Sequence, residues 1–424
     1  MLAFSRRFAL SYPSMGTARD ITTQVRKRSC LRPRSSLEYR RQRDSQQRTG
    51  EQSVSEKSNQ RRHTIVFVGG FQQAAGDGAV GGQIFACRSL IESPLKDSYE
   101  WHLIDTTQRS QPPPGIVIRS IDAARRLLRF TAAVVTGKAD AVLIFTTYGA
   151  LGFLEKGCMV LLARMSATHV VLTIRSEIRP LPSDRWLLGF RRLVVRRCSA
   201  LICQGPTAKQ SALSHLECSP GKATVIKNWI NVAAYRPLAT QRDWQRAAST
   251  LLFLGYLESF KGIAELIEAC SILKQKGCKF RLLVCGDGSL RTHLENQIAT
   301  HDLENHVELR GWCNQQEKFA ALGESGILVL PSYSEGIPNA VLEGMSSGCA
   351  IVATRVGGVP DLVESEAQGL LIPPRRVEQL VDALESLLSA PEQVQRMGAE
   401  NLRIATENHD SEHVWTKVRD VIAR

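Results

Sequence analysis

The chain has 424 residues, which is longer than most single compact domains, so two domains are expected. Its apolar runs are all far shorter than a bilayer-spanning helix, so no membrane span is expected. The net charge of +13 resembles that of a nucleic-acid binder, but residues 1–62 carry +10 of it (15 basic minus 5 acidic), which leaves +3 for the other 362 residues (13 − 10). No specific nucleic-acid partner is therefore expected.

Residues 1–62 form a basic tail rich in Arg, Ser and Gln, and they show no apolar periodicity. Such a segment buries too little apolar surface to offset its ordering entropy, so it is predicted to be disordered. Three interpretations stay open: a dispensable tail or over-extended start, an organelle transit peptide, and a polyanion-binding arm. An arginine pair interrupts the first apolar stretch, so no secretory signal is expected.

The eleven cysteines are odd in number and include no C-x-x-C pair. This pattern favours reduced thiols and a cytoplasmic location over a disulfide framework. Histidines do not cluster near the cysteines, so a zinc site is not expected either.

Strand-like and helix-like runs alternate from "HTIVFVGG" (63–70) onwards. Alternation of this kind predicts a parallel, doubly wound sheet, because a chain returns to a parallel strand through a crossover helix. The expected strands are 63–70, 102–105, 141–146, 169–174 and 199–203, with helices that include 83–93 and 121–136.

A second alternation of similar length begins at residue 250. The two series predict an α/β protein with two Rossmann-like domains that face a cleft, at 63–235 and 250–408, joined by the polar linker 236–249. The strands expected in the second domain are 250–257, 280–288, 306–312, 326–332 and 350–356.

The last segment, 409–424, is predicted to be a helix that packs back onto the first domain. It carries Val414, Val418 and Val421 on one side, at the spacing of an apolar helix face.

Two glutamates, Glu335 and Glu343, flank an expected helix start near Pro338. The first follows a strand-like run, so it lies at the carboxyl edge of the sheet, where ligands bind. The helix N-terminus between the two carboxylates attracts phosphate, and Gly336 lets the backbone approach a ligand. A sugar nucleotide fits this arrangement, with hydroxyls at both ends and a diphosphate between them. In the alternative interpretation, Glu343 is a solvated helix residue, Glu335 is a turn residue, and neither binds a ligand.

Residues 250–390 resemble the donor domain of the family 4 retaining glycosyltransferases, which have the GT-B fold. The first half resembles the family more loosely, through "GGQIFACRSL" (81–90) and "ATVIKNWINVAAYRP" (223–237). The matching motifs of the second half are "FLGYLESFKGIAELIEA" (253–269), "LVCGDGSLRTHLE" (283–295), "PSYSEGIPNAVLEGMSSG" (331–348) and "VATRVGGVPDLV" (352–363).

The resemblance implies roles for individual residues. Glu335 would contact the transferred sugar, Glu343 the ribose hydroxyls, and Lys261 the departing diphosphate. A fixed ammonium lowers the barrier electrostatically, because negative charge builds on the diphosphate as the bond breaks. The donor-binding backbone would lie around Gly336, Ile337, Pro338, Asn339 and Ala340.

Three further glycines are donor-site candidates. Gly81 and Gly82 lie at the start of the first helix, in a loop that the family uses to face the donor phosphate. Gly286, in "GDG", is expected in a tight turn beside the same cleft. The chain has no D-x-D motif, so no metal and no cofactor is expected beyond the nucleotide diphosphate sugar as co-substrate.

Two positions depart from the family pattern. Tyr256 stands where many members have a second phosphate-binding arginine. Arg175 stands where the family often has histidine, and arginine is not a base near neutral pH. Arg175 is an acceptor-side candidate that holds a phosphate or polarises a hydroxyl. An ion pair with Glu177 or another acid is the equally weighted alternative.

The segment 184–197, "DRWLLGFRRLVVRR", has an apolar stripe at helical spacing and arginines away from it. A peripheral contact with an anionic membrane is one interpretation, and a core-packing helix with a solvated arginine face is the slightly favoured one. The stripe consists of Trp186, Leu187, Phe190, Leu193 and Val194, and the arginines are Arg185, Arg192 and Arg196.

The resemblance predicts a retaining, hexosyltransferase-type enzyme that moves a sugar from a nucleotide diphosphate to an acceptor hydroxyl. The expected acceptor is a glycan or lipid-linked glycan of surface polysaccharide synthesis, reached from the cytoplasm or the inner membrane face. A nucleotide-sugar epimerase of the same fold and a non-catalytic binding protein with a basic arm are the alternatives.

Overall fold

The computed structural model describes residues 62–72, 82–107, 115–136, 139–176, 178–179 and 185–424. The predicted tail, apart from Arg62, lies outside these residues. The chain divides into the units Met1–Arg61 and Arg62–Arg424, and the description below concerns the second unit.

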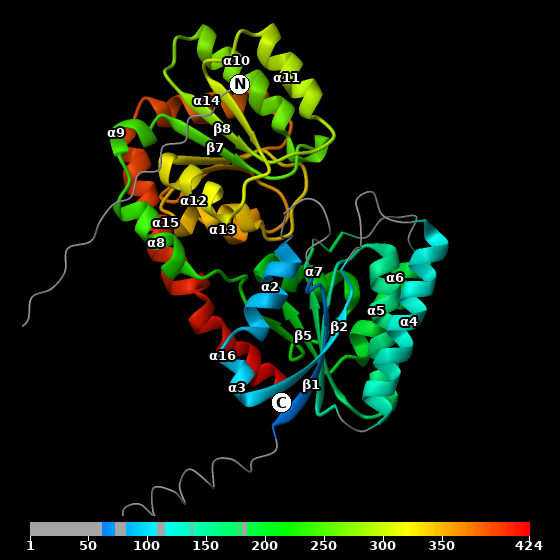
Figure 1. Ribbon diagram of the computed structural model, residues 1–424. Helices are drawn as coiled ribbons and strands as arrows, with labels where there is room; N and C mark the ends of the chain where they lie inside the picture. The colour runs from blue at the N-terminus through cyan, green and yellow to red at the C-terminus, as the bar shows by residue number, and fades with distance from the viewer. Residues whose placement is uncertain (1–61, 73–81, 108–114, 137–138, 177, 180–184) are drawn as a thin grey trace, which may run out of the picture. The chain divides into compact units, whose positions relative to one another are not determined.

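The first half forms a six-stranded parallel sheet in the order β2-β1-β3-β4-β5-β6 (Figure 1). All five strands predicted from the sequence are present within a few residues. The strands are β1 His63–Gly69, β2 Tyr99–Asp105, β3 Ala141–Thr146, β4 His169–Ile174, β5 Ala200–Cys203 and β6 Ala223–Val225. The helices are α2 Gly82–Ile91, α3 Leu95–Ser98, α4 Ile116–Val135, α5 Ala150–Met165, α6 Arg185–Arg197 and α7 Pro206–Leu216.

The second half forms another six-stranded parallel sheet, in the order β12-β11-β10-β7-β8-β9. Its strands are β7 Thr250–Leu254, β8 Arg281–Cys285, β9 Val307–Gly311, β10 Ile327–Leu330, β11 Ala350–Thr354 and β12 Gly369–Ile372. Its helices are α8 Val232–Thr240, α9 Trp244–Ala247, α10 Ile263–Gln275, α11 Arg291–Thr300, α12 Gln315–Glu324, α13 Asn339–Ser346, α14 Val377–Leu388 and α15 Pro391–His409, and short 3₁₀ turns lie at Ser259–Lys261 and Val359–Asp361.

Helices cover both faces of the second sheet, as the alternation along β7 shows. Leu251 and Phe253 belong to one buried cluster, with α10 and α14, whereas Leu252 and Leu254 belong to another, with α8 and α13. Successive residues of a strand point to opposite faces, so both faces are core. This is the doubly wound arrangement that the sequence predicts.

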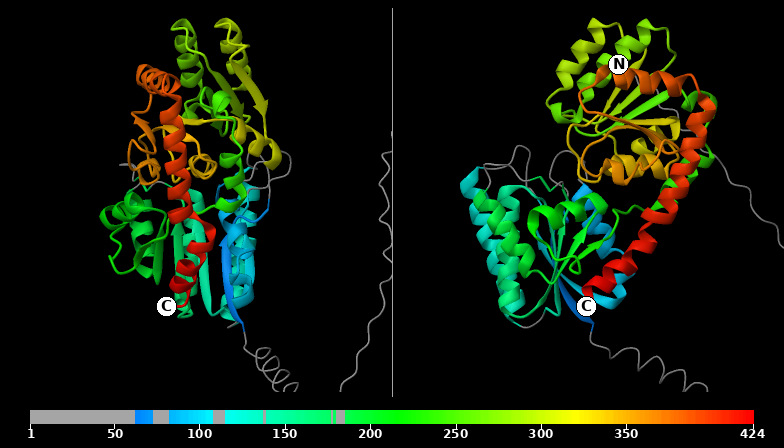
Figure 2. Two further views of the ribbon diagram at one scale, coloured as in Figure 1. Left: turned by 90° about the vertical axis from the view of Figure 1, so that its left-hand side faces the viewer. Right: turned by 180° about the vertical axis from the view of Figure 1, so that it is seen from behind.

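The last helix, α16 Ser411–Ile422, packs on the first sheet (Figure 2). Val414, Val418 and Val421 are buried in one cluster with Ile65 and Phe67 of β1. The chain therefore returns to the first half after completing the second.

The expected linker 236–249 is not a linker in the structure, because α8 and α9 occupy most of it. Arg242 is buried there, and its guanidinium donates hydrogen bonds of 2.7 Å to the carbonyls of Leu322 and Ser347. The polar composition suggested a solvated segment, but buried carbonyl oxygens satisfy the charged side chain instead.

The chain passes between the two halves twice, and the two passages pair with each other. Ile230 donates from its backbone N–H to the carbonyl of His409 and accepts from the N–H of Ser411, both at 2.9 Å. The buried ring of His409 contacts the carbonyl of Asn228 through Nδ1 at 2.8 Å. A carbonyl only accepts, so Nδ1 carries the proton and donates.

We expect the protein to lose stability as the pH falls from about 6.5 to about 4 through His409. Burial lowers the pKa of this imidazole from 6.5 to about 4. The unfolded chain therefore binds a proton in this window that the folded chain does not, and the contribution amounts to at most about 1.4 kcal/mol per pH unit. Urea unfolding at pH 7.5, 5.5 and 4.5 measures it, with His409→Asn as the comparison. Equal pH slopes in both proteins contradict this assignment.

Candidate active site

The loop after β10 leads into α13, and the helix begins at Asn339 with Pro338 as its N-cap, as predicted. Pro338 has φ −73° and ψ 121°, and no side chain caps the helix. The first N–H groups of a helix have no partners within it. This end of α13 therefore presents backbone donors at the carboxyl edge of the second sheet.

Lys261 and Glu335 form an ion pair beside this helix end, with 2.6 Å between Nζ and Oε1. The two side chains are only 16% and 10% exposed. The sequence separates them by 74 positions, and the fold brings them together because the turn carrying Lys261 packs on the loop after β10. Tyr333 donates its N–H to the carbonyl of Phe260 at 2.7 Å. Gly262 has φ +67° and lies so close to Pro331 that a Cβ on it would overlap the Pro331 carbonyl oxygen.

Glu343 lies in the second turn of α13 and is not a solvated helix residue. Its Oε1 accepts a hydrogen bond of 3.2 Å from the Tyr235 hydroxyl and pairs with the Lys318 ammonium, and the side chain is 16% exposed. Burial and the nearby Glu343 charge raise the pKa of Tyr235, so the phenol stays a donor. Tyr235 and Lys318 were missed by the sequence analysis, because their link to Glu343 depends on the packing of α8 and α12 on α13.

The loop that carries Glu335 is held from two sides by close backbone contacts. Gly358 donates its N–H to the Gly336 carbonyl at 2.8 Å. Gly357 adopts φ +51°, and a Cβ there would overlap the Glu335 carbonyl oxygen. On the other side, a Cβ on Gly336 would lie 3.3 Å from the Cα of Ser176, just after β4. The motif "VGGVPD" was quoted from the sequence, but this supporting role follows from the tertiary structure.

Arg175 follows β4 and connects to the start of α13 through Asn228. Its guanidinium donates to the Asn228 side-chain oxygen, and Asn228 donates from Nδ2 to the Asn339 Oδ1 at 2.8 Å. The guanidinium carbon also lies 5.2 Å and 5.3 Å from the ring centres of Phe145 and Trp229. Asn228 was missed as an individual residue, although it lies within the quoted motif 223–237.

Burial lowers the pKa of Arg175 to about 10. The guanidinium is therefore still protonated at neutral pH and is not a general base, in agreement with the expectation for arginine. Glu177, the ion-pair partner considered from the sequence, lies outside the described residues, and the partner that the structure gives is the Asn228 amide.

A second contact joins the two halves through Asp361. Its carboxylate accepts from the Thr207 N–H at 3.1 Å and from the Thr207 hydroxyl at 2.7 Å, at the first turn of α7. Negative charge is stabilised at a helix N-terminus, because the unpaired N–H groups there carry partial positive charge. Lys227 and Glu364 add an ion pair of 3.3 Å between the same halves.

The structure describes two of the three remaining glycine candidates for the donor site. Gly81 lies outside the described residues, whereas Gly82 is the first residue of α2. Gly286 directly follows β8 and lies so close to the Gly255 carbonyl that a Cβ would overlap its oxygen, and the turn itself follows at residues 289–290. Tyr256, at the arginine position of the family pattern, packs edge-to-face on Trp312 with ring centres 4.9 Å apart.

The helix α6 is mainly a core-packing helix, which confirms the favoured interpretation of 184–197. Leu187 and Val194 are buried, and Phe190 packs against the same cluster. Trp186 and Leu193 are exposed. The arginines expected to meet headgroups are partly engaged within the protein, since Glu217 pairs with both Arg192 and Arg196.

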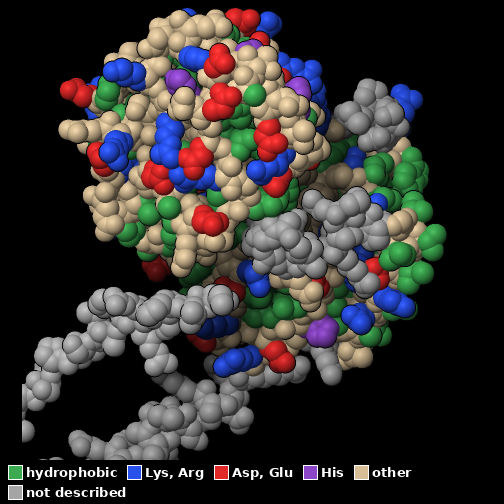
Figure 3. Space-filling model, turned by 45° about the horizontal axis from the view of Figure 1, so that its top comes forward, with side chains coloured by type: hydrophobic (Ala, Val, Ile, Leu, Met, Phe, Trp, Pro, Cys, Tyr) green, Lys and Arg blue, Asp and Glu red, His purple; other side chains and the backbone are tan. Residues whose placement is uncertain are grey.

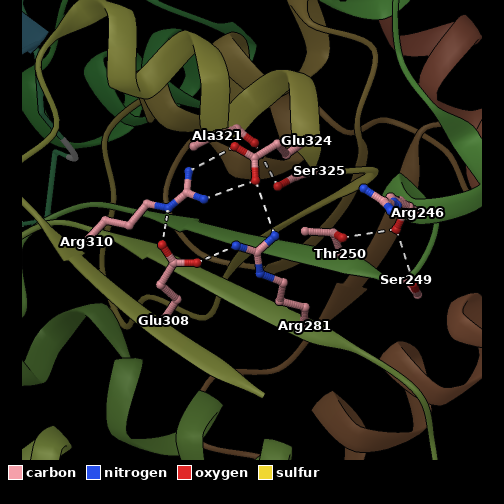
Figure 4. Close-up of polar contacts among 9 residues, drawn as sticks. All are labelled: Arg246, Ser249, Thr250, Arg281, Glu308, Arg310, Ala321, Glu324 and Ser325. Carbon is pink, nitrogen blue, oxygen red and sulfur yellow. Dashed lines mark hydrogen bonds and ion pairs between the residues drawn. The ribbon is translucent and has the colours of Figure 1, made fainter. Parts of the chain in front are cut away.

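A cavity of about 530 Å³ lies elsewhere, at the amino ends of β7 and β8. Arg281 and Arg310 bridge Glu308 and Glu324 beside it, so their charges are largely neutralised (Figure 4). Ligands of parallel α/β sheets bind at the carboxyl edge, and this cavity is at the opposite edge. We therefore assign it no part in the candidate site. Its lining residues are Leu238, Gln241, Asp243, Arg246, Thr250, Arg281, Phe319, Ala320, Gly323 and Glu324.

Two features are absent from the described residues. None of their helices combines the length and the apolar character needed to traverse a lipid bilayer. No group of three or more His, Cys, Asp or Glu side chains in this part of the chain is arranged to hold a metal ion.

Solved structures define the class of fold. Sucrose-phosphate synthase from Thermosynechococcus elongatus superposes with a TM-score of 0.69 at 17% identity, covering 85% of this chain and 98% of that one. Anabaena Alr3699/HepE, in complex with UDP and glucose, superposes with a TM-score of 0.63 at 16% identity, covering 85% and 99%. The fold is the two-domain GT-B fold of glycosyltransferases, as expected.

The second half of the chain matches a family model. Residues 241–403 match the family model "Glycosyl transferases group 1", so this part of the chain is a group 1 glycosyltransferase domain. It is 38% identical over 138 residues to the amylovoran biosynthesis glycosyltransferase AmsK of Erwinia amylovora, and 35% identical over 153 residues to the alpha-D-kanosaminyltransferase of Streptomyces kanamyceticus. These matches cover 31% and 36% of this chain, and only 34% and 39% of the two relatives.

We predict that Gly357→Ala destabilises the protein more than Gly277→Ala does. Both glycines have positive φ, at +51° and +76°, but only Gly357 lies against another backbone segment. The left-handed conformation costs about 1–2 kcal/mol at either site, and displacement of the Glu335 loop adds about 1–3 kcal/mol at Gly357. Equilibrium unfolding in urea measures both variants. Equal losses contradict the contact between Gly357 and the Glu335 loop.

Proposed function

We propose that this protein is a glycosyltransferase that moves a sugar from a nucleotide diphosphate to an acceptor hydroxyl. The observation that carries this proposal is the Lys261–Glu335 pair beside the uncapped N-terminus of α13. A cation and backbone donors suit a diphosphate, and a carboxylate held next to them suits a sugar hydroxyl. The group 1 domain and the UDP and glucose named for the Anabaena structure support the same donor class.

In the proposed mechanism, the leaving diphosphate lies at the amino end of α13. Lys261 and the N–H groups of residues 339–340 stabilise the negative charge that develops on it. Glu335 accepts hydrogen bonds from hydroxyls of the transferred sugar. Glu343 accepts from the ribose hydroxyls, and its contacts with Lys318 and Tyr235 keep its carboxylate oriented.

We propose that transfer retains the anomeric configuration and occurs on one face of a hexosyl donor. The bond from the anomeric carbon to the phosphate oxygen breaks while the bond to the acceptor oxygen forms. The acceptor proton moves to the leaving phosphate, since the protonated Arg175 cannot take it. Arg175 instead positions the start of α13 through Asn228, and no metal or other cofactor takes part.

The proposed acceptor is a glycan or lipid-linked glycan of surface polysaccharide synthesis, used in the cytoplasm or on the inner face of the membrane. The names of the relatives support a carbohydrate acceptor, because one of them acts in amylovoran biosynthesis. Trp186 and Leu193 of the segment 184–197 leave apolar surface for a peripheral membrane contact.

We expect Lys261→Ala and Glu335→Ala each to lower kcat/KM for transfer by roughly 10²–10³-fold, the usual loss for one preorganised electrostatic contact in a transition state. The exposed pair Lys276–Glu385 supplies matched controls, and Lys276→Ala and Glu385→Ala should keep full activity. Transfer from a radiolabelled nucleotide sugar to a glycan acceptor measures the rate, and circular dichroism checks folding.

Wild-type turnover in either site variant would contradict the role assigned to that residue. The donor is found first, by thermal stabilisation with a panel of nucleotide sugars, because a ligand of the folded state raises the melting temperature.

Conversion of the labelled donor to another sugar nucleotide without acceptor would show an epimerase instead. Inversion at the anomeric carbon, read by proton NMR of the product, would refute retention.

A further inference from the structure

The helix α4, Ile116–Val135, has two apolar faces, although a surface helix normally has one. Phe130 and Val134 are buried against the first sheet. Apolar side chains also point into solvent along the whole helix. Their exposed fractions are 68% for Val117, 47% for Ile121, 72% for Leu128 and 68% for Val135.

These four side chains lie on one stripe, because positions 117, 121, 128 and 135 fall within about 40° of one another at 100° per residue. Ile116 and Ile118, exposed to 68% and 50%, extend the apolar surface at the first turn. Figure 3 shows hydrophobic side chains gathered at the right-hand side of the molecule, where α4 lies in Figure 1. In a folded protein a continuous exposed apolar stripe usually marks an interaction surface.

The charge beside the stripe is positive. Arg125 and Arg129 are exposed on α4 and lie at its margin, about 60–100° round the helix from Leu128. The acidic residue of the helix, Asp122, is buried. Glu155 of α5 is paired with Arg126 on the inner side. The surface therefore combines an apolar stripe with an arginine margin.

We infer that the outer face of α4 docks onto an anionic lipid bilayer. Apolar side chains of such a helix enter the acyl boundary while arginines at its margin meet the headgroup phosphates. This inference rests on the membrane contact in the proposed function and moves the main contact from α6 to α4. The sequence pattern suggested α6, but Leu187 and Val194 of its stripe are buried and two of its arginines are paired with Glu217.

Two other occupants of the outer face of α4, the tail 1–62 and a second copy of the chain, fit its positive charge less well. The tail 1–62 carries a net charge of +10, so the arginine margin repels it. In a two-fold dimer through this face, the same surface meets itself, so Arg125 and Arg129 would approach their own copies. An anionic bilayer presents the opposite charge over the whole length of the helix.

Vesicle co-sedimentation of the full chain tests the inference. We expect binding to phosphatidylcholine vesicles that contain phosphatidylglycerol, and little binding to phosphatidylcholine alone. Arg125→Gln with Arg129→Gln should weaken binding by roughly 30-fold, since each arginine near an anionic surface contributes about fivefold. Val117→Gln with Ile121→Gln should weaken vesicle binding by roughly tenfold or more, because two exposed aliphatic side chains then no longer leave water on binding.

Trp186→Gln with Leu193→Gln on α6 is the matched control and should reduce binding less than the α4 pair. The inference is overturned if the α4 variants bind like the wild type, or if only the α6 variant loses binding. It is also overturned if light scattering shows a wild-type dimer that Val117→Gln with Ile121→Gln dissociates. Vesicle binding needs no donor or acceptor, so loss of transfer with intact binding would count against the proposed function alone.

Discussion

The ion pair between Lys261 and Glu335 is the interaction on which the candidate site depends. Both side chains are mostly buried, so each charge requires the other, and loss of one partner would leave an uncompensated charge in a poorly solvated place. The pair forms only because two loops from neighbouring strands, β7 and β10, touch along their backbones. The close contact at Gly262 makes that approach possible, since a larger side chain there would push the two loops apart, and Gly357, in the loop after β11, contacts the Glu335 loop separately.

Polar contacts connect the candidate site to the first half of the chain, and Phe85 of α2 adds an apolar contact with the cluster that includes α13. Arg175, Asn228 and Asn339 form a chain of hydrogen bonds from the end of β4 to the start of α13. Asp361 makes a second link at the first turn of α7. Each such contact contributes only a small net free energy. They can orient the donor-binding helix without fixing the two domains as strongly as the core fixes each sheet.

The surface of the first half shows how helical periodicity misleads when only one face is considered. On α6 the apolar stripe is mostly core, with Leu187 and Val194 buried. On α4 the inner stripe is core as well, but a second stripe faces solvent. Both helices carry arginines, and only the three-dimensional neighbours decide which of these charges are paired. Glu217, far from α6 in sequence, is the partner that distinguishes them.

The sequence by itself determined the two doubly wound sheets, the start of α13 and the helical form and apolar face of α16. These features follow from local patterns: strand-length apolar runs, Pro338 before the helix, and valines at helical spacing. It also indicated Glu335, Glu343 and Lys261, through motifs with a fixed order. Only the tertiary structure decided their partners, the role of Asn228, the burial of Arg242 in the supposed linker and the exposure of the outer face of α4. Those features depend on contacts between residues tens to hundreds of positions apart, and a local pattern carries no information about which distant side chain or carbonyl will satisfy a buried charge.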